Sequence, residues 1–213
     1  MQIDVWSDYA CPWCALGLAR LEEALRGFEH GDAVTVAHRA FELHRGAPAR
    51  TPGTLEQVLG RKYGMSPDQV RAGHAQLTAF GAEVGFTFDF DRVRLGSTFD
   101  AHRLTQAVRG TATEATLVRR LFEAYFTEGR QLSDHAVLRD VAASAGLPEQ
   151  LTDDVLAGPA FADEVRSDEE VASELGVTGV PYFLINGAWP VPGAQDVETL
   201  AIVLQRAWSR VEH

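Results

Sequence analysis

The sequence predicts an α/β protein in which helices flank a mixed central sheet and a large all-helical insertion interrupts the sheet domain. Three observations predict this class. A strand, a helix and a strand follow one another within the first ~40 residues, as in a βαβ unit with parallel strands. Residues 54–175 then carry almost only helical signals. Strand signals return at 182–191 around an Asn-Gly turn, and an amphipathic helix ends the chain.

The first βαβ unit consists of segments with clear periodicity. A strand is expected at 3–7, where apolar side chains occupy alternate positions. A helix is expected at 12–28, because apolar residues recur on one face and Pro12 suits the first turn of a helix. The unit ends with a strand expected at 33–43, and a Pro/Gly-rich loop at 45–53 follows it.

The central block reads as a series of helices delimited by capping residues, first-turn prolines and terminal glycines. Residues 86–90 alternate like a strand, but they are few and flanked by turns, so a loop is expected there. The block has no obvious linker and is expected to pack over the sheet domain as a lid. The helices are expected at 66–84, 98–108, 113–127, 133–145, 147–156 and 159–175.

The last part of the chain returns to the sheet. Residues 182–185 are an apolar run that predicts a strand, and Asn186-Gly187 is a hairpin dipeptide leading into a return strand at 189–191. A final helix is expected from Asp196 or Val197 to about Val211. The domain division that follows places residues 1–50 and 160–213 in the sheet domain and residues 51–159 in the helical insertion.

Composition narrows the functional class. The 213 residues carry a formal net charge of -11, so nucleic acid and anionic membranes are not expected partners. No window approaches the ~18 uninterrupted apolar residues of a membrane span. The N-terminus enters a strand pattern directly, without the basic and apolar regions of a secretory signal. A cytoplasmic location is therefore expected, where stable structural disulfides are uncommon and a cysteine pair is more often reactive.

The two cysteines of the chain form the motif Cys11-Pro12-Trp13-Cys14 between the first strand and the first helix. This context is typical of a redox dithiol, because the spacing allows a disulfide and the helix N-terminus favours a thiolate. Cys11, at the helix mouth, is expected to be the exposed attacking thiol, with a pKa below the ordinary ~8.5. Cys14, on the inward face, is expected to resolve the mixed disulfide. Pro12 and Trp13 are expected to tune the thiolate, and Trp13 also offers substrate an apolar platform.

A second candidate element of the site precedes the C-terminal hairpin, at Gly179-Val180-Pro181. A proline at the head of a strand beside a glycine is a candidate for a cis peptide bond. Such a bond would leave the backbone groups of Val180 free beside the dithiol. An extended peptide or a thiol compound would then pair with Val180 as an added strand does.

Other polar residues near the motif allow two interpretations. Asp8, and less readily Asp4, would relay a proton to Cys14 if burial raised the pKa of the carboxyl group, or would simply be solvated at a strand edge. His44 and His102 are candidates to line the cleft. A lone histidine is usually structural, however, so neither is assigned a catalytic role.

Six stretches of the chain, spread in order over nearly its whole length, carry a resemblance to a known family: Ser7-Asp8, Cys11-Pro12-Trp13-Cys14, Phe41-Glu42-Leu43, Phe99-Asp100-Ala101-His102-Arg103-Leu104, Gly176-Val177-Thr178-Gly179-Val180-Pro181-Tyr182-Phe183 and Gly193-Ala194-Gln195. Taken together, these residues resemble the thioredoxin superfamily, and within it the DsbA-like oxidoreductases of the FrnE type. The resemblance implies a thioredoxin-like fold with a helical insertion, a cis bond at Pro181 and thiol–disulfide exchange. It implies no cofactor beyond the redox-active disulfide, with glutathione as a possible co-substrate. The expected partner is a thiol or disulfide substrate, protein or small molecule, and the chain is expected to be a monomer or homodimer.

The sequence departs from the FrnE-type pattern at three positions, which affect the shape of the substrate groove rather than the dithiol. Ala15 stands where an aromatic residue is common, His44 where Asn or Asp is common, and Ser97 where Asn is common.

Three alternatives to redox exchange stay open at this point. Glutathione-dependent chromene-carboxylate isomerases and kappa-class transferases look similar, but they typically carry serine at the position of Cys11. A protein-binding module would use the groove around Pro181 and leave the dithiol idle. A zinc half-site with His30 and His38 fits poorly, because the histidines are too far apart for a zinc finger.

Overall fold

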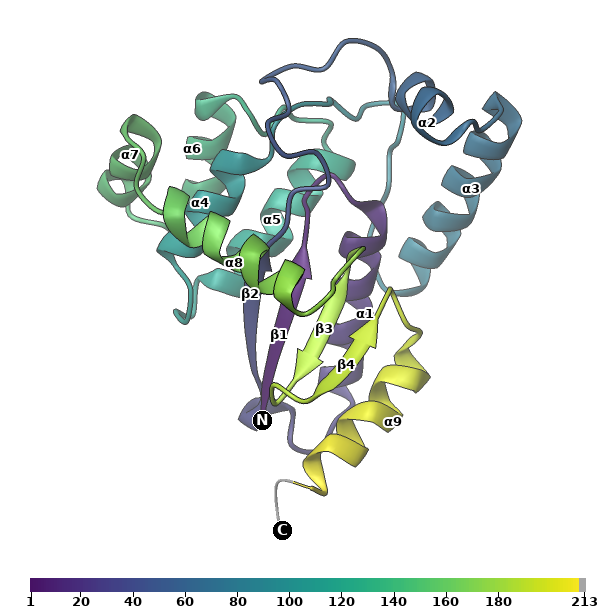
Figure 1. Ribbon diagram of the computed structural model, residues 1–213, viewed down its shortest axis with the longest axis vertical. Coiled ribbons are helices and arrows are strands. Elements are labelled where there is room, and N and C mark those ends of the chain that lie inside the picture. Colours follow the sequence, from purple (N-terminus) through teal and green to yellow (C-terminus); the bar gives the residue numbers. More distant parts are fainter. Residues whose placement is uncertain (211–213) are drawn as a thin grey trace.

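The computed structural model describes residues 1–210, which form a mixed sheet surrounded by helices (Figure 1). The predicted α/β class is confirmed. In chain order the elements are β1 (Gln2–Ser7), α1 (Pro12–Arg26), a short 3-10 turn (Gly31–Ala33), β2 (Thr35–Ala40), α2 (Leu55–Tyr63), α3 (Pro67–Glu83), α4 (Phe99–Ala107), α5 (Glu114–Phe126), α6 (His135–Ser144), α7 (Glu149–Ala157), α8 (Ala162–Glu174), β3 (Tyr182–Ile185), β4 (Trp189–Pro192) and α9 (Val197–Trp208).

The sheet has the strand order β2-β1-β3-β4. The βαβ unit makes β1 and β2 parallel, with Val5 opposite His38. The hairpin strand β3 runs antiparallel to β1, with Val5 also opposite Phe183, and β4 is antiparallel to β3. β1 is therefore a central strand that pairs with β2 on one side and with β3 on the other. The loop that leads into α1 starts at the carboxyl end of this strand.

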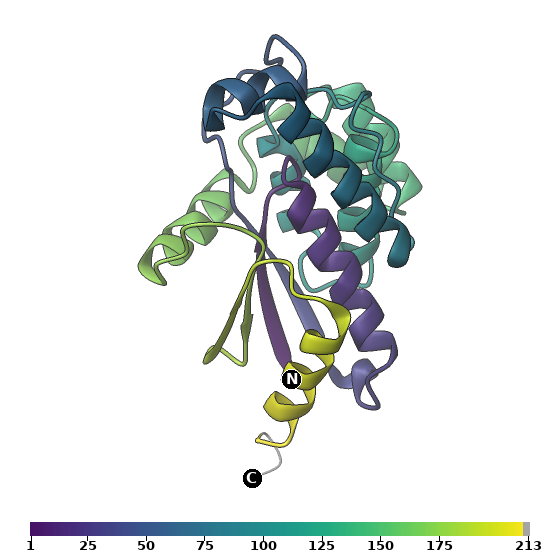
Figure 2. The same cartoon turned by 90° about the vertical axis from the view of Figure 1, so that its right-hand side faces the viewer.

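The two faces of the sheet are covered by different helices. α1 and α9 lie on one face and α8 lies on the other (Figure 2). Ile3 and Val5 of β1 belong to the main core on the α1 side, whereas Trp6 packs with Ala172 and Val177 on the α8 side. This alternation is what the period of two in the first strand predicts.

A buried carboxylate fastens α8 to its face of the sheet. Asp168 of α8 accepts hydrogen bonds from the backbone N–H of Ala40, at 2.9 Å, and from the side-chain amide of Gln106, at 2.8 Å. It also forms ion pairs with Arg39 and Arg109. These partners come from β2, α4 and the segment after α4, so one side chain joins the sheet, α8 and the helical block.

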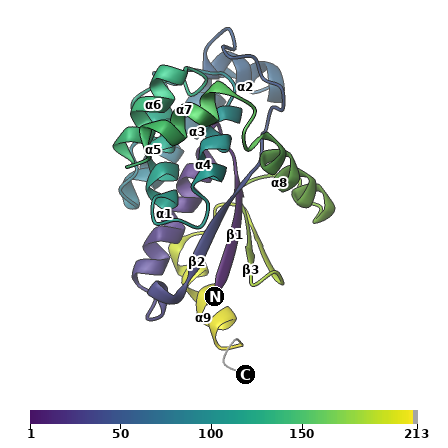
Figure 3. The same ribbon diagram turned by 90° about the vertical axis from the view of Figure 1, so that its left-hand side faces the viewer.

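The helices between β2 and α8 fall into two groups. α4 to α7 gather on the left of Figure 1, and α2 and α3 stand on its right. In Figure 3, α4 to α7 lie in front of α3. α3 and α5 both pack against α1. The division of the chain at residues 51 and 159 stays a prediction.

Two elements have other boundaries in the structure than the sequence predicts. The strand expected at 33–43 is shorter, because the N–H groups of Glu42 and Leu43 bond to the carboxylates of Glu169 and Asp8 instead of a strand. The last helix of the block begins at Ala162, later than expected. The residue before it, Phe161, has a left-handed φ of 62° that interrupts the helix.

Three further outcomes concern α2, the end of the final helix and the segment 86–90. α2 is a helix that no individual signal had predicted, although Thr54 and Gln57 form a capping box at its start. The predicted end of the final helix at Val211 lies outside the described residues. The segment 86–90 forms no strand, as predicted.

Candidate active site

The turn after β1 places the dithiol at the start of α1. The Asp8 carboxylate accepts the N–H of Ala10 at 3.1 Å, and the Asp8 carbonyl accepts the N–H of Cys11 at 3.0 Å. Cys11 is the N-cap residue of α1 with an extended backbone (φ -98°, ψ 112°), and Pro12 occupies the first turn. The Cys11 carbonyl then accepts the N–H of Cys14 at 3.0 Å. The motif therefore lies at the positive end of the helix dipole, as predicted.

The thiol of Cys11 is less accessible than expected. Only 5% of the residue is exposed, so the prediction of an exposed Cys11 is wrong. The reason is the loop before β3, whose Val180 carbonyl lies 3.6 Å from the Cys11 sulfur and accepts its S–H. The Cys11 side chain makes no capping hydrogen bond within the helix. Both cysteines are free thiols in this structure.

Cys14 is fully buried on the inner face of α1, as its position in the helical period predicts. Burial raises the pKa of the Cys14 thiol well above its ordinary value. The hydrogen bond to Cys11 and the negative charge of the Cys11 thiolate raise the pKa of Cys14 further, as does the charge of Asp8. Cys14 therefore holds its proton as long as Cys11 is present as a thiolate.

The outer rim of the site contains the other predicted residues. Trp13 is 42% exposed, and Pro12 and Val180 are half-buried. Pro181 is buried, and the Val180–Pro181 peptide bond is cis. The structure thus brings Cys11 and Val180 into direct contact and leaves the Trp13 ring in solvent beside them.

Gly17 is a residue of this site that sequence reasoning missed. A Cβ atom at Gly17 would lie 2.9 Å from Cγ of Pro181, closer than real Cβ contacts allow. The glycine therefore lets the loop carrying Val180 approach α1. A glycine inside a helical pattern was the available signal, since it costs about 1 kcal/mol relative to alanine and usually has a packing reason.

Asp8 is buried beneath the dithiol and gathers donors from three parts of the chain. Besides the N–H of Ala10, its carboxylate accepts the N–H of Leu43 at 2.7 Å and the hydroxyl of Thr98 at 2.8 Å. His102 approaches it with Nε2 at 3.7 Å from Oδ1. Asp8 therefore ties the cysteine loop to the end of β2 and to the start of α4.

The charge state of Asp8 contradicts the premise of the proton relay. Burial alone would raise the pKa of the Asp8 carboxyl group, but His102 and the N–H groups of Ala10 and Leu43 outweigh it and lower the pKa below its ordinary value. Asp8 is thus a buried carboxylate that stays ionised at neutral pH. It is neither a solvated surface acid nor a protonated donor for Cys14.

The remaining candidates lie in other surroundings. Asp4 accepts the guanidinium of Arg39 at 2.8 Å, and His44 is exposed on the loop after β2. The histidines of the zinc alternative are engaged elsewhere. His38 Nδ1 lies 3.0 Å from the Glu114 carboxylate, and the ring of His30 stacks on that of Trp208. Within residues 1–210, no three Cys, His, Asp or Glu side chains are grouped to hold a metal ion.

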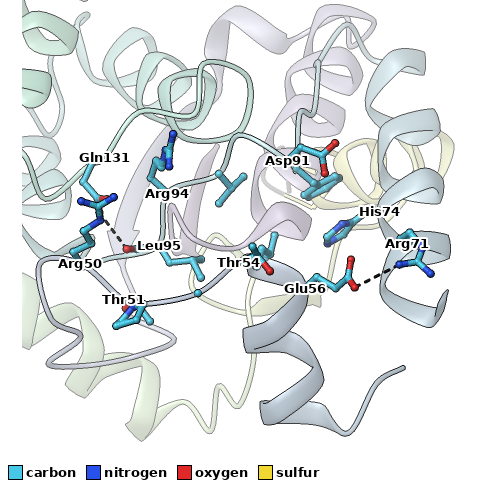
Figure 4. Close-up of a pocket in the computed structure, with 15 residues that line it drawn as sticks. Arg50, Thr51, Thr54, Glu56, Arg71, His74, Asp91, Arg94, Leu95 and Gln131 are labelled. Carbon is cyan, nitrogen blue, oxygen red and sulfur yellow. Dashed lines mark hydrogen bonds and ion pairs between the residues drawn. The ribbon is translucent and has the colours of Figure 1, made fainter. Parts of the chain in front are cut away.

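A separate pocket of about 480 Å³ lies between the loop before α2, the helix α3 and the segment 90–95 (Figure 4). Arg50 and Arg94 lie on one side of it, and Arg71 and His74 on the other. None of the predicted site residues lines this pocket. The dithiol therefore lies outside the pocket, in the shallow rim beside Val180.

Comparison with known proteins places this architecture in a family. Residues 2–205 match the DSBA-like thioredoxin domain, and the chain belongs to this family. The predicted thioredoxin-like fold with a helical insertion is confirmed. In the described part of the chain, no helix is long and apolar enough to cross a membrane.

Three known proteins are similar to this chain in sequence or in structure. The crystal structure of a probable DsbA oxidoreductase from Streptomyces coelicolor is 40% identical, with a TM-score of 0.92 over 98% of this chain and 90% of that chain. An uncharacterized protein of Bacillus subtilis (strain 168), YwbO, is 27% identical over 95% of this chain and 96% of its own length. A 2-hydroxychromene-2-carboxylate isomerase, 16% identical with a TM-score of 0.70 over 99% and 96% of the two chains, shares the fold.

Proposed function

We propose that this chain is a thiol–disulfide oxidoreductase in which Cys11 is the attacking thiolate and Cys14 the resolving thiol. One observation carries the proposal: the two cysteines lie at the N-terminal end of α1, with one at the rim and the other sealed behind it. Membership of the DSBA-like family supports the same chemical class.

The exchange balances without any further cofactor. The Cys11 thiolate attacks one sulfur of a substrate disulfide; the new S–S bond forms as the substrate S–S bond breaks, and the departing thiolate takes up a proton. Cys14 then loses its proton and attacks the Cys11 sulfur, which releases the second substrate thiol. The substrate gains two electrons and two protons, and the protein is left with a Cys11–Cys14 disulfide. The reverse sequence oxidises a substrate dithiol.

The order of the two steps follows from the electrostatics of the pair. The helix N-terminus favours negative charge at Cys11. Burial raises the pKa of Cys14 most, and the thiolate at Cys11 raises it further. Once Cys11 is consumed in a mixed disulfide, the contribution of its charge is gone. The pKa of Cys14 then falls by that contribution, which favours loss of its proton at the resolving step.

The rim is the part of the site that a substrate would contact. The backbone of Val180, whose carbonyl faces the Cys11 sulfur, would pair with an extended substrate, and Trp13 would support an apolar group beside it. Because Cys11 is 5% exposed, the substrate sulfur has to approach along this rim. The proposal includes a FrnE-type activity in the cytoplasm on protein or small-molecule thiols and disulfides, with glutathione as a possible co-substrate.

The test is reduction of insulin disulfides with dithiothreitol as the electron donor. Cys11→Ser is expected to lose the activity, because it removes the attacking sulfur. Cys14→Ser, as the matched variant, is expected to accumulate mixed disulfides with substrate that gel electrophoresis detects under non-reducing conditions. Full activity of Cys11→Ser would overturn the proposal. No activity of the wild-type protein above that of dithiothreitol alone would also overturn it, and would favour a binding module in which the dithiol is idle.

A further inference from the structure

His102 is a buried histidine, and one nitrogen of its imidazole makes no hydrogen bond within the described part of the chain. It lies in α4 and is 3% exposed. Its Nε2 atom has no hydrogen-bond partner within residues 1–210 and points to the Asp8 carboxylate, at 3.7 Å from Oδ1. The ring also packs against that of Tyr9, with centroids 4.8 Å apart. A buried polar atom without a partner is uncommon and calls for a reason.

The groups around Asp8 and His102 include two phenols and a thiol. Burial raises the pKa of Tyr9 and of Tyr125 well above their usual range, so both phenols stay neutral. Cys14, on the α1 side, also holds its proton. No lysine or arginine of the described chain forms an ion pair with Asp8. The Asp8 carboxylate therefore faces the His102 imidazole and neutral donors.

We propose that His102 is a positioning residue of the redox site, which acts through Asp8 to set how readily the dithiol is oxidised. The proposal rests on the thiol–disulfide exchange proposed above. His102 touches neither cysteine in any recorded contact; its effect passes through the carboxylate that Ala10, Leu43 and Thr98 hold in place. Since those three donors remain when the imidazole is removed, the Asp8 carboxylate keeps them and loses only the imidazole nitrogen that faces it.

The direction of the effect follows from the charges. The negative charge of Asp8 disfavours a thiolate in the dithiol, because like charges repel and Asp8 is bonded to the loop that carries Cys11. Removing His102 exposes more of that charge to the reduced, thiolate-bearing form. The reduced form then becomes less stable relative to the uncharged disulfide. His102→Gln is therefore expected to shift the equilibrium with glutathione toward the protein disulfide, with oxidised glutathione as the oxidant and two reduced glutathiones as products.

The experiment measures that equilibrium at pH 7 for the full chain and for three variants. His102→Gln is expected to move the equilibrium constant on the order of tenfold toward the disulfide, the equivalent of one pKa unit at the thiol. Asp8→Asn is expected to move it toward the dithiol. The double variant is expected to behave as Asp8→Asn alone, because His102 acts through Asp8. An unchanged His102→Gln equilibrium, or an additive double variant, would overturn the proposal.

A measurement on the unmodified protein keeps the proposal testable if a variant does not fold. Carbon-13 NMR of the Asp8 carboxyl group and nitrogen-15 NMR of the His102 ring are expected to show signals that shift together across a pH series. An Asp8 carboxyl signal that moves independently of the His102 ring would contradict the proposal. Failure of the exchange activity itself has a different signature: no Cys11–Cys14 disulfide would form in the wild-type protein at any glutathione ratio.

Discussion

The two sides of the Cys11–Cys14 pair differ in their exposure to solvent and in their hydrogen bonding. On the outer side, the Trp13 ring is 42% exposed. The inner side is closed, and Asp8, Tyr9 and His102 are all nearly inaccessible there. The outer side can therefore adapt to a substrate, while the inner side is fixed by hydrogen bonds and sets the properties of the sulfurs. The predictions below test this difference, beginning with the largest expected effect.

Removing the carboxylate on the inner side is expected to cost the most stability. Asp8→Ala leaves the N–H groups of Ala10 and Leu43 and the hydroxyl of Thr98 without their acceptor in a buried site. We expect the free energy of unfolding to fall by about 3–5 kcal/mol, measured by urea denaturation. A loss below about 1 kcal/mol would mean that water or another group replaces the carboxylate, and that the inner side is not fixed as described.

The packing between α1 and the Pro181 loop is expected to be sensitive to a single methyl group. Gly17→Ala places a Cβ 2.9 Å from Pro181 Cγ, and such overpacking typically costs about 1–3 kcal/mol. Exchange activity is expected to fall as well, because the Val180 carbonyl moves away from Cys11. Gly73→Ala in α3 is the matched control, since it meets no atom within 4 Å and is expected to gain about 0.5–1 kcal/mol from helix propensity. Equal stability changes in the two variants would contradict the close approach.

The stability that Asp8 contributes is expected to depend on pH in a defined direction. Because its pKa is lowered in the folded protein, the contribution is present above the unfolded-state value of about 3.9 and is lost as pH falls through the folded value. The stability difference between wild type and Asp8→Asn should therefore be constant from pH 7 to about pH 5 and shrink below about pH 4. Urea unfolding across this range measures it. A difference that grows on acidification would mean that the pKa of Asp8 is raised.

Changes on the outer side are expected to leave stability almost untouched. Trp13→Ala removes an exposed ring, so the free energy of unfolding should stay within about 0.5 kcal/mol of wild type. Insulin reduction is expected to show a higher KM at similar kcat, because the ring supports substrate rather than the reacting sulfurs. A large loss of kcat without a change in KM would place Trp13 on the chemical step instead.

The parts of the fold that the sequence predicts are those encoded locally. Periodicity, caps and turn dipeptides place β1, α1 and the C-terminal hairpin, and the motif Cys11-Pro12-Trp13-Cys14 follows from its position between a strand and a helix. Local patterns also predict that Cys14 faces inward. α2 is the exception among the helices, because its short apolar pattern is weak and only its capping box marks it.

The parts of the site that the sequence does not predict depend on contacts between distant segments. The cover over Cys11 comes from Val180, 169 residues further along the chain. The lowered pKa of Asp8 depends on Leu43 and His102, which only the folded chain brings to the carboxylate. From the sequence, a raised pKa is only one of two interpretations of Asp8, and it is the one that burial alone would produce. The opposing donors that reverse its direction are visible only in the structure.

The most direct test of the account measures whether the two cysteines form a disulfide. The reduced protein is equilibrated with glutathione buffers of increasing oxidation and quenched with acid. Its free thiols are then alkylated and counted by mass spectrometry. We predict that the protein reversibly loses two hydrogens as a disulfide forms, and that peptide mapping places this disulfide between residues 11 and 14. Two alkylated cysteines throughout the series, or a lasting glutathione adduct on Cys11 that Cys14 never displaces, would contradict the account.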